Sequence, residues 1–139
     1  MLSGLILAGR VLFVAVFLYS SVGHLTKMKM MAGYAKSKRV PLPWAATFVG
    51  GVFLLAGGLS VLLGVWADLG ALLLAVFLVP TAVLMHGFWH ERGGGRTIEQ
   101  TQFLKDLSLA GAALMLAGLL SYAGHGLGLT LTGPLLHLH

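Results

Sequence analysis

The chain has 139 residues, of which 58% are hydrophobic and only 9% are charged, and its mean hydropathy is +0.92. A soluble domain carries about 25% charged residues, so the composition excludes an ordinary soluble fold and predicts one membrane domain over residues 1–139. The sequence has no cysteine, which excludes disulfides, thiolate metal sites and thiol–disulfide relays within the chain.

Four segments are long and apolar enough to cross a bilayer, for which a helix needs about 20 residues. They span about 2–24, 44–66, 68–89 and 103–123, and a short tail follows over 124–139. The apolar runs are continuous rather than alternating, and four strands cannot close a barrel in lipid. No basic residue precedes the first run and the run is too long for a secretory signal, so we expect it to be retained. The sequence predicts an all-α integral membrane protein, a four-helix antiparallel bundle.

Basic residues are distributed unevenly along this topology. Eight of the nine lysines and arginines lie in the connection after the first helix, or between the third helix and the start of the fourth. With four crossings these two regions share a side, which the positive-inside rule places in the cytoplasm, with both termini outside. The net charge of +5 is therefore explained by topology and anionic lipid. No nucleic-acid motif is present.

Small residues recur on two of the predicted helices. The second helix has five glycines, and the fourth has small residues at close spacing: Gly50, Gly51, Gly57, Gly58 and Gly64; Ala110, Gly111, Ala113, Ala117 and Gly118. Such residues let helix backbones approach closely in lipid. The alternative is that glycine is simply common in membrane helices.

Arg10 lies inside the first apolar run, where a charge is costly and indicates function by default. Two interpretations remain open. In the first, Arg10 is structural, either as an ion pair with Asp68, which lies on the same side at the start of the third helix, or as an anchor that extends its guanidinium toward the membrane surface. In the second, Arg10 contacts an anionic or carbonyl-bearing ligand.

Polar and aromatic residues gather where three predicted helices meet the basic side. His24 ends the first helix, His86, Trp89 and His90 end the third at spacings i, i+3 and i+4, and Gln102, Lys105 and Asp106 begin the fourth. Residues at these spacings share one helix face. The cluster indicates either a ligand pocket that opens at the interface or an interfacial belt of aromatic and basic residues. The glycine-rich stretch "RGGGR" at 92–96 predicts a flexible loop.

Neither a metal nor hydrolytic chemistry is supported by the sequence. The i, i+4 pair of His86 and His90 lacks an evident third ligand, so we expect no metal and no haem. No serine or threonine accompanies a motif-like base and acid.

The chain resembles the DoxX family of small bacterial and archaeal membrane proteins over roughly residues 9–120. The resemblance rests on the order and spacing of "GR" at 9–10, "GHLTKMKMMAGYAKSKRVPLP" at 23–43, "GGVFLLAGGLSVLLG" at 50–64, "HGFW" at 86–89 and "QFLKDLSLAG" at 102–111. It implies a four-helix bundle in the cell (inner) membrane and a redox neighbourhood, since relatives are associated with thiosulfate oxidation linked to quinones and with oxidative-stress complexes. The family pattern carries over Arg10, His24, Tyr34, Pro41, His86, Trp89, Gln102 and Lys105. Two positions depart from it: Phe53 replaces a glutamate found in many relatives, and Asp106 replaces a frequent asparagine.

Three functions remain open at this point. The first is a membrane subunit of a quinone-linked oxidoreductase or oxidative-stress complex, without a catalytic core of its own and supplied with electrons by a soluble or membrane redox protein. It would bind a quinone-like amphipathic molecule, with Arg10 and His86 as candidate proton donors or polar contacts and Lys105, Asp106 and Trp89 at the mouth. The second is a non-catalytic anchor that recruits soluble partners through its basic loops. The third is a small-molecule transporter or channel formed by a homo-oligomer.

Overall fold

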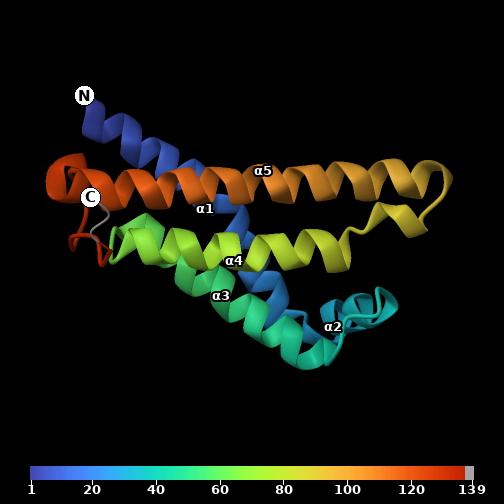
Figure 1. Ribbon diagram of the computed structural model, residues 1–139. Helices are drawn as coiled ribbons and strands as arrows, with labels where there is room; N and C mark the ends of the chain where they lie inside the picture. The colour runs from blue at the N-terminus through green and yellow to red at the C-terminus, as the bar shows by residue number, and fades with distance from the viewer. Residues whose placement is uncertain (137–139) are drawn as a thin grey trace.

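The computed structural model describes residues 1–136 and contains four long helices that are apolar enough to cross a membrane. These are α1 (Leu2–Thr26), α3 (Pro43–Leu63), α4 (Ala67–Met85) and α5 (Gly93–Ala123). Shorter helices connect or follow them: α2 (Met28–Ser37), the 3₁₀ turn η1 (Phe88–His90) and the 3₁₀ turn η2 (Gly124–Leu127). The described residues contain no strand. The all-α prediction with four antiparallel spanning helices is confirmed (Figure 1).

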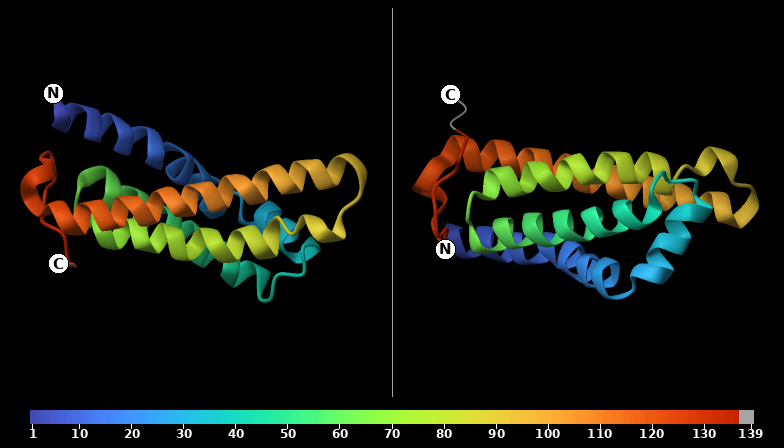
Figure 2. Two further views of the ribbon diagram at one scale, coloured as in Figure 1. Left: turned by 45° about the horizontal axis from the view of Figure 1, so that its top comes forward. Right: turned by 90° about the horizontal axis from the view of Figure 1, so that it is seen from below.

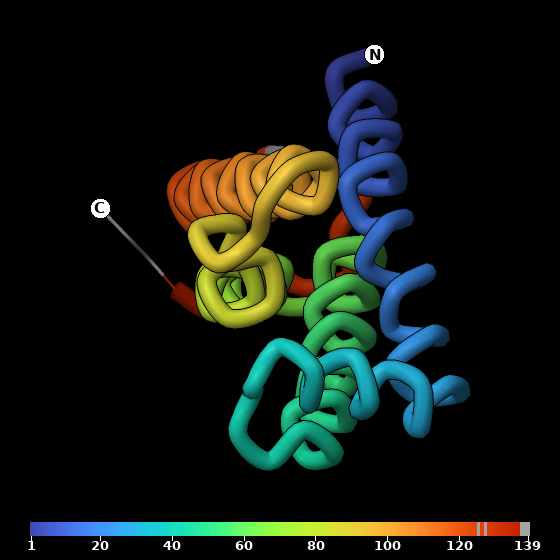
Figure 3. Tube along the Cα trace, turned by 90° about the vertical axis from the view of Figure 1, so that its right-hand side faces the viewer, coloured from blue at the N-terminus to red at the C-terminus, as the bar shows by residue number. Residues whose placement is uncertain are grey.

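The long helices pack in the spatial order α1, α3, α4, α5, with α1 against α3 and α5 against α4. Seen end-on, α2 lies across one end of the bundle, beside the start of α3 (Figure 3). This end also holds η1 and the start of α5. We call it the basic end, because eight of the nine lysines and arginines lie in or beside these segments. The opposite end, which we call the tail end, holds the N-terminus, the α3–α4 turn and the segment after α5 (Figure 2).

The core is built from small and branched apolar side chains, and it includes Phe17, Leu54, Val61 and Leu74 together with buried alanines of α5. Large apolar side chains also cover the outside, for example Leu12, Val76 and Met115, which are 77%, 62% and 73% exposed. A surface of this kind is stable in contact with lipid rather than water. The bundle therefore contacts the bilayer directly.

Glycine allows α3 and α4 to approach closely near the tail end. A Cβ atom on Gly57 would lie 2.8 Å from Leu74 and 3.0 Å from the carbonyl oxygen of Gly70. The packing expected of the second-helix glycines is thus present at Gly57. In contrast, a Cβ on Gly111 or Gly118 of α5 would meet nothing within 4 Å, so these two glycines do not serve packing among the described residues.

Two features of the basic end differ from the sequence prediction. The segment 92–96 was expected to be a flexible loop, but Arg92 is the N-cap of α5 and residues 93–96 form its first turn. Gly93 has φ +57°, a left-handed value that glycine adopts without strain. The 31 residues of α5 extend about 46 Å at 1.5 Å per residue, which exceeds the roughly 30 Å hydrocarbon core. The first turns of α5 therefore project beyond the spanning part of the bundle.

The second difference is the end of α4. The third span was predicted to continue to residue 89, and the candidate membrane span covers Ala67–His90, but the regular α-helix α4 ends at Met85 and His86 is its C-cap. Gly87 follows with extended backbone, and a Cβ there would lie 2.7 Å from the Trp89 ring. The tight turn needs glycine, and glycine also disfavours helix continuation.

Candidate functional site

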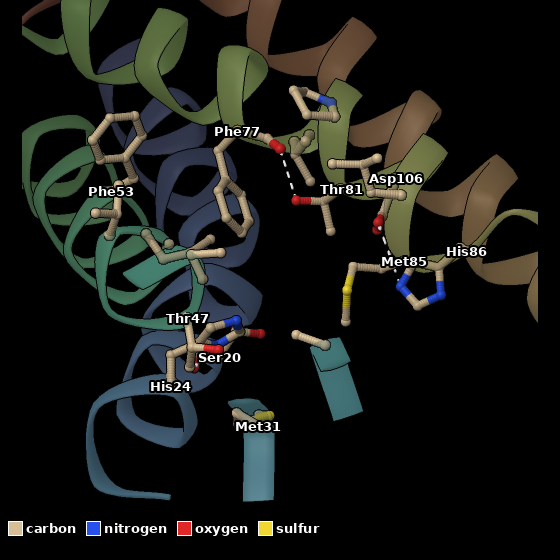
Figure 4. Close-up of a pocket in the computed structure, with 18 of the residues that line it drawn as sticks. Ser20, His24, Met31, Thr47, Phe53, Phe77, Thr81, Met85, His86 and Asp106 are labelled. Carbon is tan, nitrogen blue, oxygen red and sulfur yellow. Dashed lines mark hydrogen bonds and ion pairs between the residues drawn. The ribbon is translucent and has the colours of Figure 1, made fainter. Parts of the chain in front are cut away.

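A cavity of about 470 Å³ lies in the basic-end half of the bundle and is lined by residues of α1 to α5. Its volume falls within the range of small-molecule sites, about 300–1,000 Å³. Phe53, Leu54 and Phe77 contribute apolar walls, and the polar side chains that line it are Ser20, His24, Tyr34, Thr47, Thr81, His86, Lys105 and Asp106 (Figure 4). A mostly apolar chamber with polar groups set into its wall is suited to an amphipathic ligand.

His86 is held between two carboxylates. Its Nδ1 atom lies 2.8 Å from Glu99 Oε2, and its Nε2 atom lies 3.7 Å from Asp106 Oδ2. An ionised carboxylate only accepts hydrogen bonds, so Nδ1 carries a proton in this arrangement. Asp106 is only 5% exposed and lines the cavity together with His86. The pair therefore presents a titratable imidazole and a buried carboxylate to any molecule in the chamber.

The second carboxylate oxygen of Glu99 binds side chains of α2, the short helix that connects α1 to α3. Glu99 Oε1 accepts hydrogen bonds from Lys38 Nζ at 2.7 Å and from the Tyr34 hydroxyl at 3.2 Å. Lys38 Nζ also lies 3.1 Å from Glu91 Oε1. We call Tyr34, Lys38, Glu91 and Glu99 the latch, because they tie α2 to η1 and α5 across the basic end.

Burial and contacts within the latch shift the pKa values of two side chains that lie outside the spanning segments. Burial lowers the pKa of Lys38, but hydrogen bonds from its ammonium group to Glu99 and Glu91 outweigh this, and the net pKa is raised. Burial raises the pKa of Tyr34, and the negative charge of Glu99 raises it further. Both groups therefore remain protonated at neutral pH, and the latch keeps its donors.

Polar groups from α1, α3 and α4 line the chamber away from the latch. The hydroxyls of Thr47 and Thr81 each donate at 2.8 Å to a carbonyl of their own helix, which leaves their oxygens available as acceptors. His24 Nδ1 donates to the Ser20 carbonyl at 2.9 Å, so a neutral His24 ring has Nε2 as an acceptor. His24 also packs edge-on against Phe77, with ring centroids 6.4 Å apart.

The residues predicted to form the site are only partly brought together. His24, His86, Lys105 and Asp106 line the cavity. Gln102 lies one turn away and accepts a hydrogen bond from Lys105. Trp89 is 48% exposed and packs edge-on against Phe88 of the η1 turn and Phe103 of α5. Because α4 ends at Met85, Trp89 and His90 do not share a helix face with His86.

Arg10 is at the opposite end and does not form the expected ion pair with Asp68. It is 2% exposed and donates through Nε to the carbonyl of Val61 at 2.8 Å, through Nη2 to Leu62 at 2.6 Å and through Nη1 to Leu129 at 2.9 Å. Val61 and Leu62 are in the last turn of α3, whose carbonyls lack helical partners and carry partial negative charge. Arg10 satisfies them and fixes the tail segment at the same point.

Asp68 has partners in the same tail segment. Its carboxylate accepts hydrogen bonds from the backbone amides of Leu135 at 3.1 Å and Leu136 at 2.7 Å. The Leu131 amide donates to Leu63 O at 3.3 Å, and the Thr132 amide donates to Gly64 O at 3.0 Å. The ion-pair prediction was wrong because the tail supplies a separate partner for each charge. Both residues hold the segment 129–136 across the tail end.

Sequence reasoning missed Glu99, the residue that organises the site. Glu99 lies between the predicted loop at 92–96 and the predicted start of the fourth helix near 103, so it was not placed on a helix face. Glu99 and Asp106 are seven positions apart in the sequence. Because the helix begins at Gly93, both carboxylates lie on one helix face, and each contacts one ring nitrogen of His86. Within residues 1–136, no group of three or more His, Cys, Asp or Glu side chains is arranged to hold a metal ion.

Four apolar helices around a ligand-sized cavity define a small multi-pass membrane protein. The DoxX family model matches residues 5–87, and the chain belongs to this family. It is similar to the inner membrane protein YphA of Escherichia coli (strain K12), with 26% identity over 113 residues that cover 81% of each chain. No solved structure matches the chain significantly.

Proposed function

We propose that this DoxX-family protein binds a quinone-like amphipathic molecule in the basic-end cavity and serves as a membrane subunit of a redox complex. The placement of His86 between Asp106 and Glu99 carries the proposal. An apolar chamber of about 470 Å³ accommodates a ring, and its buried polar end offers groups that donate to and accept from a carbonyl-bearing head.

Proton movement is the chemistry that these residues can support. Reduction of a quinone to a quinol takes up two electrons and two protons. Histidine is suited to deliver protons near neutral pH, and Asp106, His86 and Glu99 lead from the cavity to the latch at the basic end. We assign the electrons to a partner protein, because the chain has no cysteine for thiol chemistry.

We propose that the basic end faces the cytoplasm, as the positive-inside rule predicts, and that the protein resides in the inner membrane like its relative YphA. Protons for the ligand would then come from the cytoplasm. The tail segment held by Arg10 and Asp68 covers the opposite end, an arrangement that favours a binding site over a continuous pore through one copy.

A second candidate function is supported by the exposed charges of the basic end. Six cationic side chains there are exposed and lie outside the cavity lining: Lys27, Lys29, Lys36, Arg39, Arg92 and Arg96. They could attract an acidic partner protein, so partner recruitment and ligand binding are compatible roles. Substituting Lys36 and Arg39 by glutamine should reduce recovery of a cross-linked partner without affecting ligand affinity.

Ligand binding can be tested with two histidines that differ in position. A benzoquinone that carries a decyl tail is titrated into the detergent-purified protein, and binding is followed by calorimetry. We expect His86→Gln to weaken binding at least tenfold and His90→Gln, at an exposed position outside the cavity, to change it less than twofold. Equal affinity for the wild type and His86→Gln would contradict the proposed function.

A further inference from the structure

Both ends of the cavity-bearing bundle are covered by the chain itself. At the tail end, Arg10 and Asp68 hold the segment 129–136 in place. At the basic end, α2 contributes Met31, Tyr34 and Ala35 to the cavity wall and is tied down by the latch. What remains exposed of the cavity wall at the basic end is polar: Tyr34 is 42% exposed and the Lys105 side chain is 49% exposed.

The side of the bundle between α3 and α4 is different. The two helices are in close contact near Gly57 and Gly70 and diverge toward the basic end (Figure 1), where the cavity lies. Val49 of α3, with Val76 and Leu84 of α4, line the cavity and are also 47%, 62% and 49% exposed on the outer surface. Residues that face both the cavity and the outside mark an opening between them.

The surroundings of this opening are uncharged and mostly apolar, and their polar members are Thr47 and Thr81. Ala46 and Phe53 of α3 and Pro80 of α4 line the same region, and no charged residue lies between 43 and 63 or between 69 and 85. Both helices belong to membrane-spanning segments, so the opening faces hydrocarbon rather than water. His86 and Asp106 lie on one side of the cavity, and Ser20, His24 and Thr47 lie across from them (Figure 4).

We propose that the cavity exchanges its ligand with the bilayer through this α3–α4 opening, and that the ligand is a membrane-dissolved amphipath with a long hydrocarbon tail. The head reaches His86 and Asp106, and the tail remains between α3 and α4 in contact with lipid. The identity of the head group rests on the proposed function above, whereas the route and the tail rest on the opening itself.

Two valines of α3 provide a matched test of the route. Val49 and Val52 are 47% and 40% exposed, but only Val49 lines the cavity. With the decyl-benzoquinone in lipid nanodiscs, we expect Val49→Trp to slow association at least tenfold and Val52→Trp to change it less than twofold. Equal effects of the two substitutions, or no effect of either, would overturn the proposal.

The position of the tail is tested by a decyl-benzoquinone with a diazirine at the end of its tail. After irradiation, we expect label on residues 46–53 and 76–84. Label on α2 or on 129–136 instead would overturn the proposed route, even if binding still requires His86. Label at the expected segments in both the wild type and His86→Gln, with unchanged affinity, would support the route and contradict the proposed function.

Discussion

Glu99 and His86 form the contact on which the basic end is organised, with Nδ1 of His86 2.8 Å from Oε2 of Glu99. The other oxygen of the same carboxylate binds Lys38 and Tyr34. One side chain thus fixes the site histidine through Oε2 and the cover of the cavity through Oε1. A change in the charge of Glu99 must affect both.

Glu99→Gln and Glu91→Gln separate these two roles. Both residues bind Lys38, but only Glu99 also binds His86. Hydrogen bonds to charged groups contribute about 1.5–3 kcal/mol, so Glu99→Gln should lower the free energy of local α2 opening by about that amount and weaken quinone binding. Glu91→Gln, whose carboxylate is more exposed, should have less than half this effect on α2 and none on binding. Hydrogen exchange of residues 28–37 measures the first effect and calorimetry the second. Identical results for the two variants would show that Glu99 does not couple α2 to His86.

The latch should weaken in strongly alkaline solution. The pKa values of Lys38 and Tyr34 are raised in the folded protein. Raised values mean that both groups contribute stability below their unfolded pKa values, about 10.4 for lysine and about 10 for tyrosine. This stability is lost as the pH rises above about 10. Protection of α2 amides, corrected for intrinsic exchange, should therefore be flat from pH 7 to 9 and fall above 10. In a Lys38→Met, Tyr34→Phe double variant the alkaline step should disappear.

Arg10 is expected to be a structural residue of high energetic importance. Arg10→Met would leave the carbonyls of Val61, Leu62 and Leu129 without their donors in a buried place. Unsatisfied buried groups cost about 1–3 kcal/mol each, so we expect a loss of about 3 kcal/mol or more in thermal unfolding in detergent. Arg96→Met is the control, since Arg96 is exposed and lies 5.8 Å from the Phe88 ring, a contact of about 0.5–1 kcal/mol. Quinone affinity of the folded Arg10→Met protein should be unchanged. Loss of binding without loss of stability would instead support the interpretation in which Arg10 contacts the ligand.

The sequence was sufficient for the four spanning helices, because long apolar runs have few other stable arrangements in lipid. It also indicated that His86, Lys105 and Asp106 meet at one end. It could not predict the partner of Arg10, because carbonyls at the end of a helix have no sequence signature. Glu99 was missed for a related reason: three glycines suggested a loop, and tertiary contacts to Lys38 and His86 stabilise a helix that local propensity disfavours. Asp68 shows the same limit, because its partners are backbone amides of a tail that sequence alone cannot place.

Replacing glycine by alanine should have opposite effects on stability in α3 and in α5. A Cβ on Gly57 would lie 2.8 Å from Leu74, so Gly57→Ala forces α3 and α4 apart and should destabilise the protein by about 1–3 kcal/mol. Gly111 has open space around it, so Gly111→Ala should be neutral or stabilising by up to about 1 kcal/mol, the usual gain from replacing glycine within a helix. Thermal unfolding in detergent compares them directly. If the face of α5 that carries Gly111 joins two copies of the chain, Gly111→Ala should instead reduce cross-linking between subunits in native membranes. An unchanged monomer with raised stability would show that this glycine contacts only lipid.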